Sequence, residues 1–289
     1  MDCQEKFIKY LSGHSGCEIS LFQGPDGLFV RKTAGRTDYN KRLRIQLAKQ
    51  LAYKSTQNPN DIHAPKIYGT GVCDNIFYFD MQYLECRTMA EYMNNISDNE
   101  LQRFVNLVMH ELHLDDCVMM PDTNSIFQKK IKSLYQNVPG DQIYIDALQR
   151  LEKYDFSNVP YSKCHGDLTL ENILLDSKND IYLIDFLDSF FDSWMIDVAK
   201  LLQDIELGWS YRHDNISDTL RDNLSKSKDL LINSIKQLPD GDKKITDIYH
   251  ILLLNVMRIV PYTKDDITKE FLKTAIQKLN KILDNQGAL

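Results

Sequence analysis

The first part of the chain consists of short runs in which apolar residues dominate or alternate with polar ones, and these runs predict strands. A Gly-Pro-Asp-Gly turn at 24–27 separates two of the runs, which is typical of a β-hairpin. A leucine at every fourth position from 43 to 51 predicts a helix over 39–53. The expected strands are 17–22, 28–32 and 76–81.

From about residue 85 the spacing of apolar residues becomes that of helices. Ser97 and Glu100 have the spacing of a capping box, which predicts the start of a helix. One hairpin interrupts the helices, with apolar runs at 173–175 and 181–184 around a polar turn. The other expected helices are 88–93, 123–136, 141–154, 194–207, 216–237, 243–259 and 264–284.

This change of period predicts an α+β protein with two lobes. A small sheet-rich lobe is expected at 1–84 and a larger helical lobe at 85–289, with the hairpin placed between the two. No repeat and no linker rich in Gly, Pro or Ser marks another boundary.

The composition limits the kinds of partner and the location that we expect for this protein. The chain has 34 Lys and Arg against 41 Asp and Glu, a net charge of −7, and no clustered basic run, so we expect no nucleic-acid partner. No signal peptide is evident, and the apolar run at 251–254 ends well before the roughly 20 residues that span a bilayer. The six cysteines lack metal-ligand spacing and are expected to be reduced thiols. These features predict a cytoplasmic protein without a membrane partner.

The candidate chemistry lies around the hairpin. His165-Gly166-Asp167 opens a loop that ends at Asn172, and the returning strand delivers Asp185 to the same edge. Phosphoryl transfer needs a carboxylate near the attacking hydroxyl, together with an amide and a second carboxylate on magnesium. The loop and hairpin supply these three groups in one compact segment.

These residues resemble the aminoglycoside phosphotransferase and choline kinase family, a branch of the protein-kinase-like fold. The match consists of H-G-D-x-x-x-x-N at 165–172, I-D-F at 184–186 and the later W-M-I-D-V-A at 194–199. The resemblance implies a two-lobed kinase fold and transfer of the γ-phosphate of ATP, with Mg²⁺, to a hydroxyl of a small molecule. The implied roles are catalytic base for Asp167, magnesium ligands for Asn172 and Asp185, and structural acid for Asp197.

The resemblance also implies a nucleotide site in the small lobe. The stretch 81–85 looks like the family's hinge, where backbone groups of Gln82 and Leu84 would receive the adenine. Lys32, on the strand after the first hairpin, looks like the nucleotide-binding lysine, with its neighbour Arg31 as the alternative.

Two parts of this nucleotide site depart from the family pattern. The loop 12–17 has only two glycines, so Ser15 and Gly16 either present N–H groups to phosphates or form an ordinary turn. The helix after Lys32 lacks the glutamate that usually pairs with the lysine, and Gln46 or Gln50 is expected to take its place without the charge.

Two further groups of polar residues have weaker explanations. His110 and His113 have the spacing of metal ligands but fit the rim of an amphipathic helix better. A group of acids with one tryptophan follows the hairpin, and it is expected either to be a solvated surface or to line a pocket for a hydroxylated or cationic acceptor. The members of this acidic group are Asp188, Asp192, Asp204, Glu206 and Trp209.

Two other functions compete with a small-molecule kinase. A protein kinase normally carries Arg after the loop His and Lys two positions after the Asp, whereas this chain has Gly166 and Thr169. Only twelve positions separate Asp185 from Asp197, too few for a long peptide-docking segment. The departures in the glycine loop and helix favour a catalytically silent nucleotide-binding scaffold, whereas the intact set of Lys32, Asp167, Asn172 and Asp185 opposes it.

Overall fold

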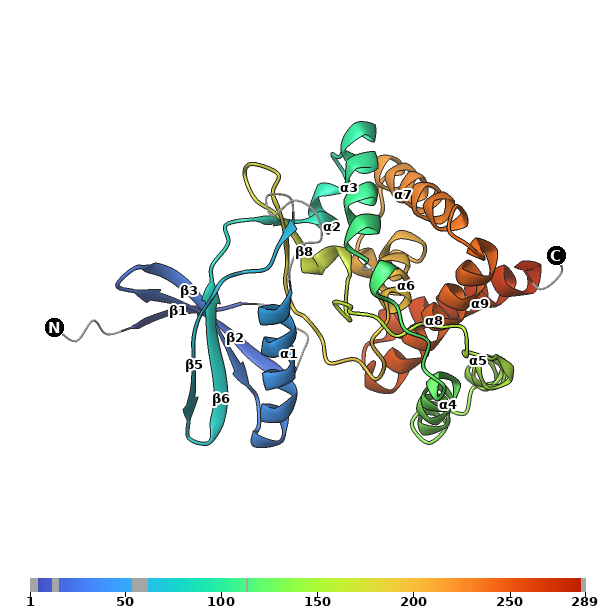
Figure 1. Cartoon of the computed structure of the whole chain (residues 1–289), viewed down its shortest axis with the longest axis horizontal. Coiled ribbons are helices and arrows are strands. Elements are labelled where there is room, and N and C mark those ends of the chain that lie inside the picture. Colours follow the sequence, from blue (N-terminus) through green and yellow to red (C-terminus); the bar gives the residue numbers. More distant parts are fainter. Residues whose placement is uncertain (1–4, 12–15, 54–61, 113, 287–289) are drawn as a thin grey trace. The chain divides into compact units, whose positions relative to one another are not determined.

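The computed structural model describes residues 5–11, 16–53, 62–112 and 114–286 (Figure 1). The chain divides into two compact units, one formed by 1–88 with 172–188 and the other by 89–171 with 189–289. In the described residues, strands dominate the first unit and helices the second, which agrees with the predicted α+β class.

An antiparallel five-stranded sheet in the order β1-β2-β3-β6-β5 dominates the first unit. The predicted hairpin joins β2 to β3, with Gly24 paired to Gly27, and β3 lies at the centre of the sheet. The bounds of the strands are β1 Lys6–Tyr10, β2 Cys17–Gly24, β3 Gly27–Ala34, β5 Ile67–Cys73 and β6 Ile76–Gln82.

Helix α1 (Asn40–Ala52) lies alongside this sheet and closes its core (Figure 1). Leu43 and Leu47 pack with residues of β3 and β6, namely Ala34, Phe77 and Phe79. The expected third member of the stripe, Leu51, is 60% exposed. Eight residues advance a helix by about 80° beyond two full turns, so Leu51 leaves the buried face.

A second, four-stranded sheet has the order β4-β9-β8-β7 and includes the predicted hairpin. Strand β4 pairs in parallel with β9, and β7 pairs antiparallel with β8. This pairing groups the hairpin with the first unit, although its residues come after residue 85 in the chain. The bounds are β4 Ile62–His63, β7 Arg87–Thr88, β8 Ile173–Leu175 and β9 Ile181–Leu183.

The second unit packs its helices around α8 (Gly241–Ile259), which contacts α5, α6, α7 and α9. Residues 247–257 of α8 are all buried, so this helix is enclosed on every side. Helix α3 (Asp98–Glu111) begins with the predicted capping box, because Ser97 and Glu100 exchange hydrogen bonds. The other bounds are α2 Met89–Tyr92, α4 Thr123–Leu134, α5 Gln142–Lys153, α6 Trp194–Ile205, α7 Asp218–Lys236 and α9 Asp266–Gln286.

Among the described residues, no helix combines the length and the apolar character needed to cross a bilayer.

Candidate active site

Hydrogen bonds hold the start of the loop that carries Asp167. The Asp197 carboxylate accepts from the backbone N–H groups of His165 and Gly166, both at 2.7 Å. The Asp167 N–H donates to His165 Nδ1 at 3.2 Å, and Gly166 has a φ of +90°, which glycine adopts readily. Asp197 therefore supports the loop as predicted, and the buried His165 helps to order it.

A second carboxylate of α6 holds the far end of the same loop. Asp204 accepts from the N–H of Leu170 at 2.6 Å and from the N–H and hydroxyl of Ser210 at 2.9 and 2.7 Å. Burial raises the pKa of Asp204 to about 6, although these hydrogen bonds act in the opposite direction. Asp204 therefore ties the loop to the segment after α6 and is not available to an acceptor.

Helix α6 also contacts the side chain of the candidate base. Lys200 Nζ lies 3.0 Å from Asp167 Oδ1, and the Asp167 side chain is 29% exposed. Burial acts to raise the pKa of Asp167, but the charge and hydrogen bond of Lys200, with smaller effects of His165 and Arg258, bring it below its usual value. The Lys200 ammonium therefore stabilises the ionised form of the Asp167 carboxylate.

Lys200 and Asp204 are the residues of this loop support that the sequence reasoning missed. Together with Asp197 they have i, i+3 and i+7 spacing, which places them on one face of a helix that is otherwise largely apolar. A polar stripe of this kind was the available signal in the sequence.

The hairpin brings the two candidate magnesium ligands to one end. Ile173 pairs with Leu183, and the N–H of Ile184 donates to the carbonyl of Asn172 at 3.0 Å, so Asn172 and Asp185 flank the same end of the two strands. An amide and a carboxylate oxygen suit Mg²⁺, which usually binds one or two protein carboxylates together with water and substrate phosphates. The donor set therefore fits the ion. In the described ranges, no group of three or more His, Cys, Asp or Glu side chains forms a separate metal site.

Lys32 and Arg31 occupy different environments on β3. Lys32 is 3% exposed and its Nζ donates to Asp185 Oδ1. Arg31 makes two hydrogen bonds to Asp80, at 2.7 and 2.8 Å, and its guanidinium lies 4.2 Å from the centre of the Tyr78 ring. The structure thus brings Lys32, and not Arg31, to the candidate magnesium ligand.

The two glutamines of α1 are both buried but differ in their contacts. Gln50 donates to the carbonyl of Pro65 at 2.8 Å, which ties the helix to the chain before β5. Gln46 donates to the Tyr39 hydroxyl at 3.3 Å, and its buried Oε1 meets no hydrogen-bond donor among the described residues. Gln46 therefore has a side-chain oxygen, Oε1, that can still accept a hydrogen bond.

The predicted adenine and phosphate contacts are only partly defined. The N–H of Gln82 donates to the carbonyl of Lys66 at 2.8 Å, and Leu84 lies in the irregular segment 83–86. Ser15 lies outside the described residues. The carbonyl of Gly16 accepts from the N–H of Gly35 at 3.0 Å, and a Cβ at Gly35 would approach that carbonyl oxygen to 2.7 Å, so glycine is needed there.

The acidic group expected to line an acceptor pocket is largely engaged elsewhere. Glu206 forms ion pairs with Lys278 at 2.6 Å and Lys228 at 3.5 Å. Trp209 packs its ring against Phe271 and lies 4.1 Å from the Arg212 guanidinium. Glu206 and Trp209, like Asp204, therefore make contacts within the helical unit.

The chain was also compared with known protein families, curated proteins and solved structures. The model of the phosphotransferase enzyme family (APH) matches residues 123–226, which include the loop at 165–172, the hairpin and α6. No curated protein sequence matches the chain significantly.

Solved structures resemble the whole chain. A thermostable mutant of aminoglycoside phosphotransferase APH(4)-Ia, in a ternary complex with ADP and hygromycin B, has a TM-score of 0.64 at 14% identity and covers 98% of this chain and 95% of its own. Choline kinase LicA from Streptococcus pneumoniae has a TM-score of 0.57 at 15% identity, with coverages of 96% and 94%. LicA in complex with AMP has a TM-score of 0.57 at 16% identity, with coverages of 97% and 94%.

At these identities the solved structures establish the fold, which is the protein-kinase-like fold expected from the sequence. The family model and the structural neighbours together confirm the resemblance of this chain to the aminoglycoside phosphotransferase and choline kinase family.

Proposed function

We propose that the protein is an ATP-dependent phosphotransferase that moves the γ-phosphate to a hydroxyl of a small molecule. The observation that carries the proposal is the placement of Asp167, a partly exposed carboxylate paired with Lys200 on a loop held by Asp197 and Asp204. Such a group can orient a hydroxyl and accept its proton.

Transfer of the γ-phosphate to a hydroxyl forms one bond to phosphorus, breaks another and releases a proton. As the acceptor oxygen forms its bond to the γ-phosphorus, the bond between that phosphorus and the bridging β-phosphate oxygen breaks and ADP leaves. The hydroxyl proton passes to Asp167 and then to solvent. Catalysis of this kind depends mainly on position and charge.

The groups of the first unit supply the nucleotide side of the reaction. Lys32 is proposed to bind the α- and β-phosphates, and Asn172 and Asp185 to hold Mg²⁺. When bound, Mg²⁺ neutralises charge on the phosphates. The backbone of Gln82 and Leu84 is proposed to bind adenine and that of Ser15 and Gly16 the phosphates. Solved neighbours are described with ADP and with AMP, which supports a nucleotide substrate.

A sugar or amino alcohol is the proposed acceptor class. Only residues 186–193 connect Asp185 to α6, so this connection offers little length for peptide docking. One neighbour is a choline kinase, and another is an enzyme with hygromycin B bound. Choline and hygromycin B are both small hydroxylated molecules. The engagement of Asp204, Glu206 and Trp209 weakens the case for a broad acidic cleft, so we rank a polycationic aminoglycoside below the other acceptors. A cytoplasmic location is proposed because the six cysteines lack metal-ligand spacing and are expected to be reduced thiols.

Transfer of labelled γ-phosphate to a panel of sugars, amino alcohols, aminoglycosides and generic proteins tests the proposal. Labelling of a small molecule is the expected result. Labelling of proteins alone would indicate a protein kinase. Nucleotide binding without any transfer would favour the silent scaffold, for which the neutral Gln46 is the supporting observation.

A further inference from the structure

Lys200 stands out among the residues of α6. Every other position of this helix, from Trp194 to Ile205, is buried, whereas the Lys200 side chain is 12% exposed. Lysine is rarely found in such surroundings because removing its charge from water is costly. A compensating partner is therefore required.

That partner is the candidate base. Lys200 Nζ lies 3.0 Å from Asp167 Oδ1 and donates to the Oε1 of the buried Gln203 at 3.4 Å. Gln203 thus orients the ammonium from its own helix while the ammonium faces the carboxylate. The other groups whose charge acts on Asp167 are His165 of the same loop and Arg258 near the end of α8.

The catalytic loop supplies no lysine or arginine of its own. Between His165 and Asn172 its side chains are apolar, neutral or acidic, and position 169 holds a buried threonine. A cation next to Asp167 therefore has to come from another element. The face of α6 that already carries Asp197 and Asp204 delivers it.

We infer that Lys200 is a positioning residue for phosphoryl transfer, which holds the Asp167 carboxylate in the orientation and charge state that accept the acceptor's proton. This inference rests on the proposed function. A charged hydrogen bond fixes a carboxylate more firmly than a neutral one, and misplacement of a base by a fraction of an ångström slows proton transfer.

The test compares Lys200→Met and Lys200→Gln, which remove the charge, with Lys200→Arg, which keeps it. Lys226→Met is the matched control, because Lys226 forms an exposed ion pair with Asp98 in the same unit. Carbon-13 NMR of the Asp167 carboxyl gives its pKa without any need for activity. We expect both neutral variants to raise that pKa by about 1 to 3 units, and the arginine and control variants to leave it within about 0.5 unit.

Kinetics supply the second readout. At neutral pH, Lys200→Met is expected to lower kcat at least about 10-fold while the KM for ATP stays within about twofold, and to move the acid limb of the kcat/KM profile to higher pH. Lys200→Gln provides the same comparison should the methionine variant fail to fold.

The outcomes separate this inference from the proposed function. Normal transfer by the wild type, with kcat and the Asp167 pKa unchanged in both neutral variants, would overturn the role of Lys200 and leave the function intact. No transfer by the wild type, together with the expected change of pKa, would reject the function and the catalytic part of the inference, while the electrostatic coupling of Lys200 to Asp167 would stand.

Discussion

At the scale of single residues, neighbours on a strand point to opposite faces, so Lys32 and Arg31 cannot share one role. The sequence predicted this alternation and favoured Lys32, but it could not show where each side chain ends. Lys32 contacts Asp185, which lies 153 positions farther along the chain, and Arg31 contacts Asp80, which lies 49 positions farther along. Such pairings depend on the tertiary fold of the first unit and not on local pattern.

Replacement of each of these two residues by methionine should separate binding from stability. Lys32→Met should lower ATP affinity at least about 10-fold with little loss of stability, because an apolar chain suits the buried position and the partly exposed Asp185 can be hydrated. Arg31→Met should leave ATP affinity unchanged and lower the free energy of unfolding by about 1–3 kcal/mol through loss of the bonds to Asp80. Titration calorimetry and chemical denaturation measure the two effects, and the reverse pattern would identify Arg31 as the nucleotide-binding residue.

Gln46 is the residue that we expect to help to place Lys32 in the nucleotide complex. Burial raises the pKa of Tyr39, and the hydrogen bond from Gln46 and the charge of Lys32 both act against this rise, which puts the three side chains in one neighbourhood. Gln46→Ala should raise the KM for ATP severalfold, and Gln46→Glu should lower it by giving the lysine a charged partner.

Gln50→Ala is the control for this pair. It loses the bond to the carbonyl of Pro65 and should cost about 1 kcal/mol of stability without a comparable change in the KM for ATP. A larger kinetic effect from Gln50 than from Gln46 would show that the roles are exchanged.

At the scale of elements, the sequence predicted the long helices and both hairpins, because their apolar spacing and turn residues are local signals. It missed β1 and β5 for physical reasons. All five residues of β1 are exposed, so no alternation marks it. Strand β5 contains Gly69 and Gly71, and a Cβ at Gly71 would lie 2.4 Å from the Tyr78 hydroxyl oxygen, so this strand lacks side chains where its neighbour needs space.

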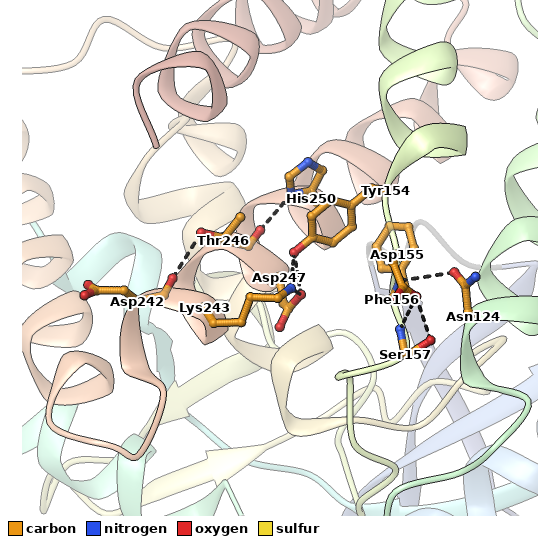
Figure 2. A network of polar contacts seen from close by, with 10 residues as sticks. All are labelled: Asn124, Tyr154, Asp155, Phe156, Ser157, Asp242, Lys243, Thr246, Asp247 and His250. Carbon is orange, nitrogen blue, oxygen red and sulfur yellow. Dashed lines mark hydrogen bonds and ion pairs between the residues drawn. The ribbon is translucent and has the colours of Figure 1, made fainter. Parts of the chain in front are cut away.

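A polar network links the end of α5 to α8 (Figure 2). The Tyr154 hydroxyl donates to Asp247 at 2.5 Å, and Lys243 donates to both of these groups at 2.6 Å. The ring of His250 stacks on Tyr154 with 3.5 Å between centres, and its Nδ1 lies 2.8 Å from the Thr246 carbonyl oxygen. Burial lowers the pKa of His250 to about 4.

This buried histidine should make the protein sensitive to acid. Because the pKa is about 6.5 in the unfolded chain and about 4 in the folded one, the unfolded state binds more protons between these values. The contribution of His250 to the free energy of unfolding is fully present above pH 6.5. As pH falls toward 4 this contribution is lost, which lowers the free energy of unfolding by about 3 kcal/mol in total.

His250→Phe keeps a ring against Tyr154 but removes the proton site. Its free energy of unfolding, relative to that of the wild type, should therefore improve as pH falls from 6.5 to 4, which urea denaturation at several pH values measures. Tyr154→Phe is the control and should lower stability by a similar amount at each pH. If the difference in free energy of unfolding between the wild type and His250→Phe stays constant with pH, the lowered pKa of His250 is wrong.

At the scale of the whole molecule, the grouping of the hairpin with the first unit depends on a strand pair between distant parts of the chain. The parallel pair β4 and β9 joins Ile62 to Ile181, and no local pattern announces a contact across 119 positions. The proposed catalytic motif was nevertheless visible in the sequence, because its residues lie within 165–185. The chain leaves the helical unit at Glu171 and returns to it at Ser189, so the motif contributes Asp167 to one unit and Asn172 and Asp185 to the other.

Asp167 is proposed to be the base of a phosphoryl transfer to a small-molecule hydroxyl. The most direct measurement is the turnover of Asp167→Asn and of the wild type with labelled ATP and the acceptor that the panel identifies, with nucleotide affinity measured on both proteins. We predict that the variant binds ATP within about twofold of the wild type and turns over at least about 10²-fold more slowly, because the amide cannot accept the proton. Wild-type turnover by Asp167→Asn on that acceptor would contradict the account.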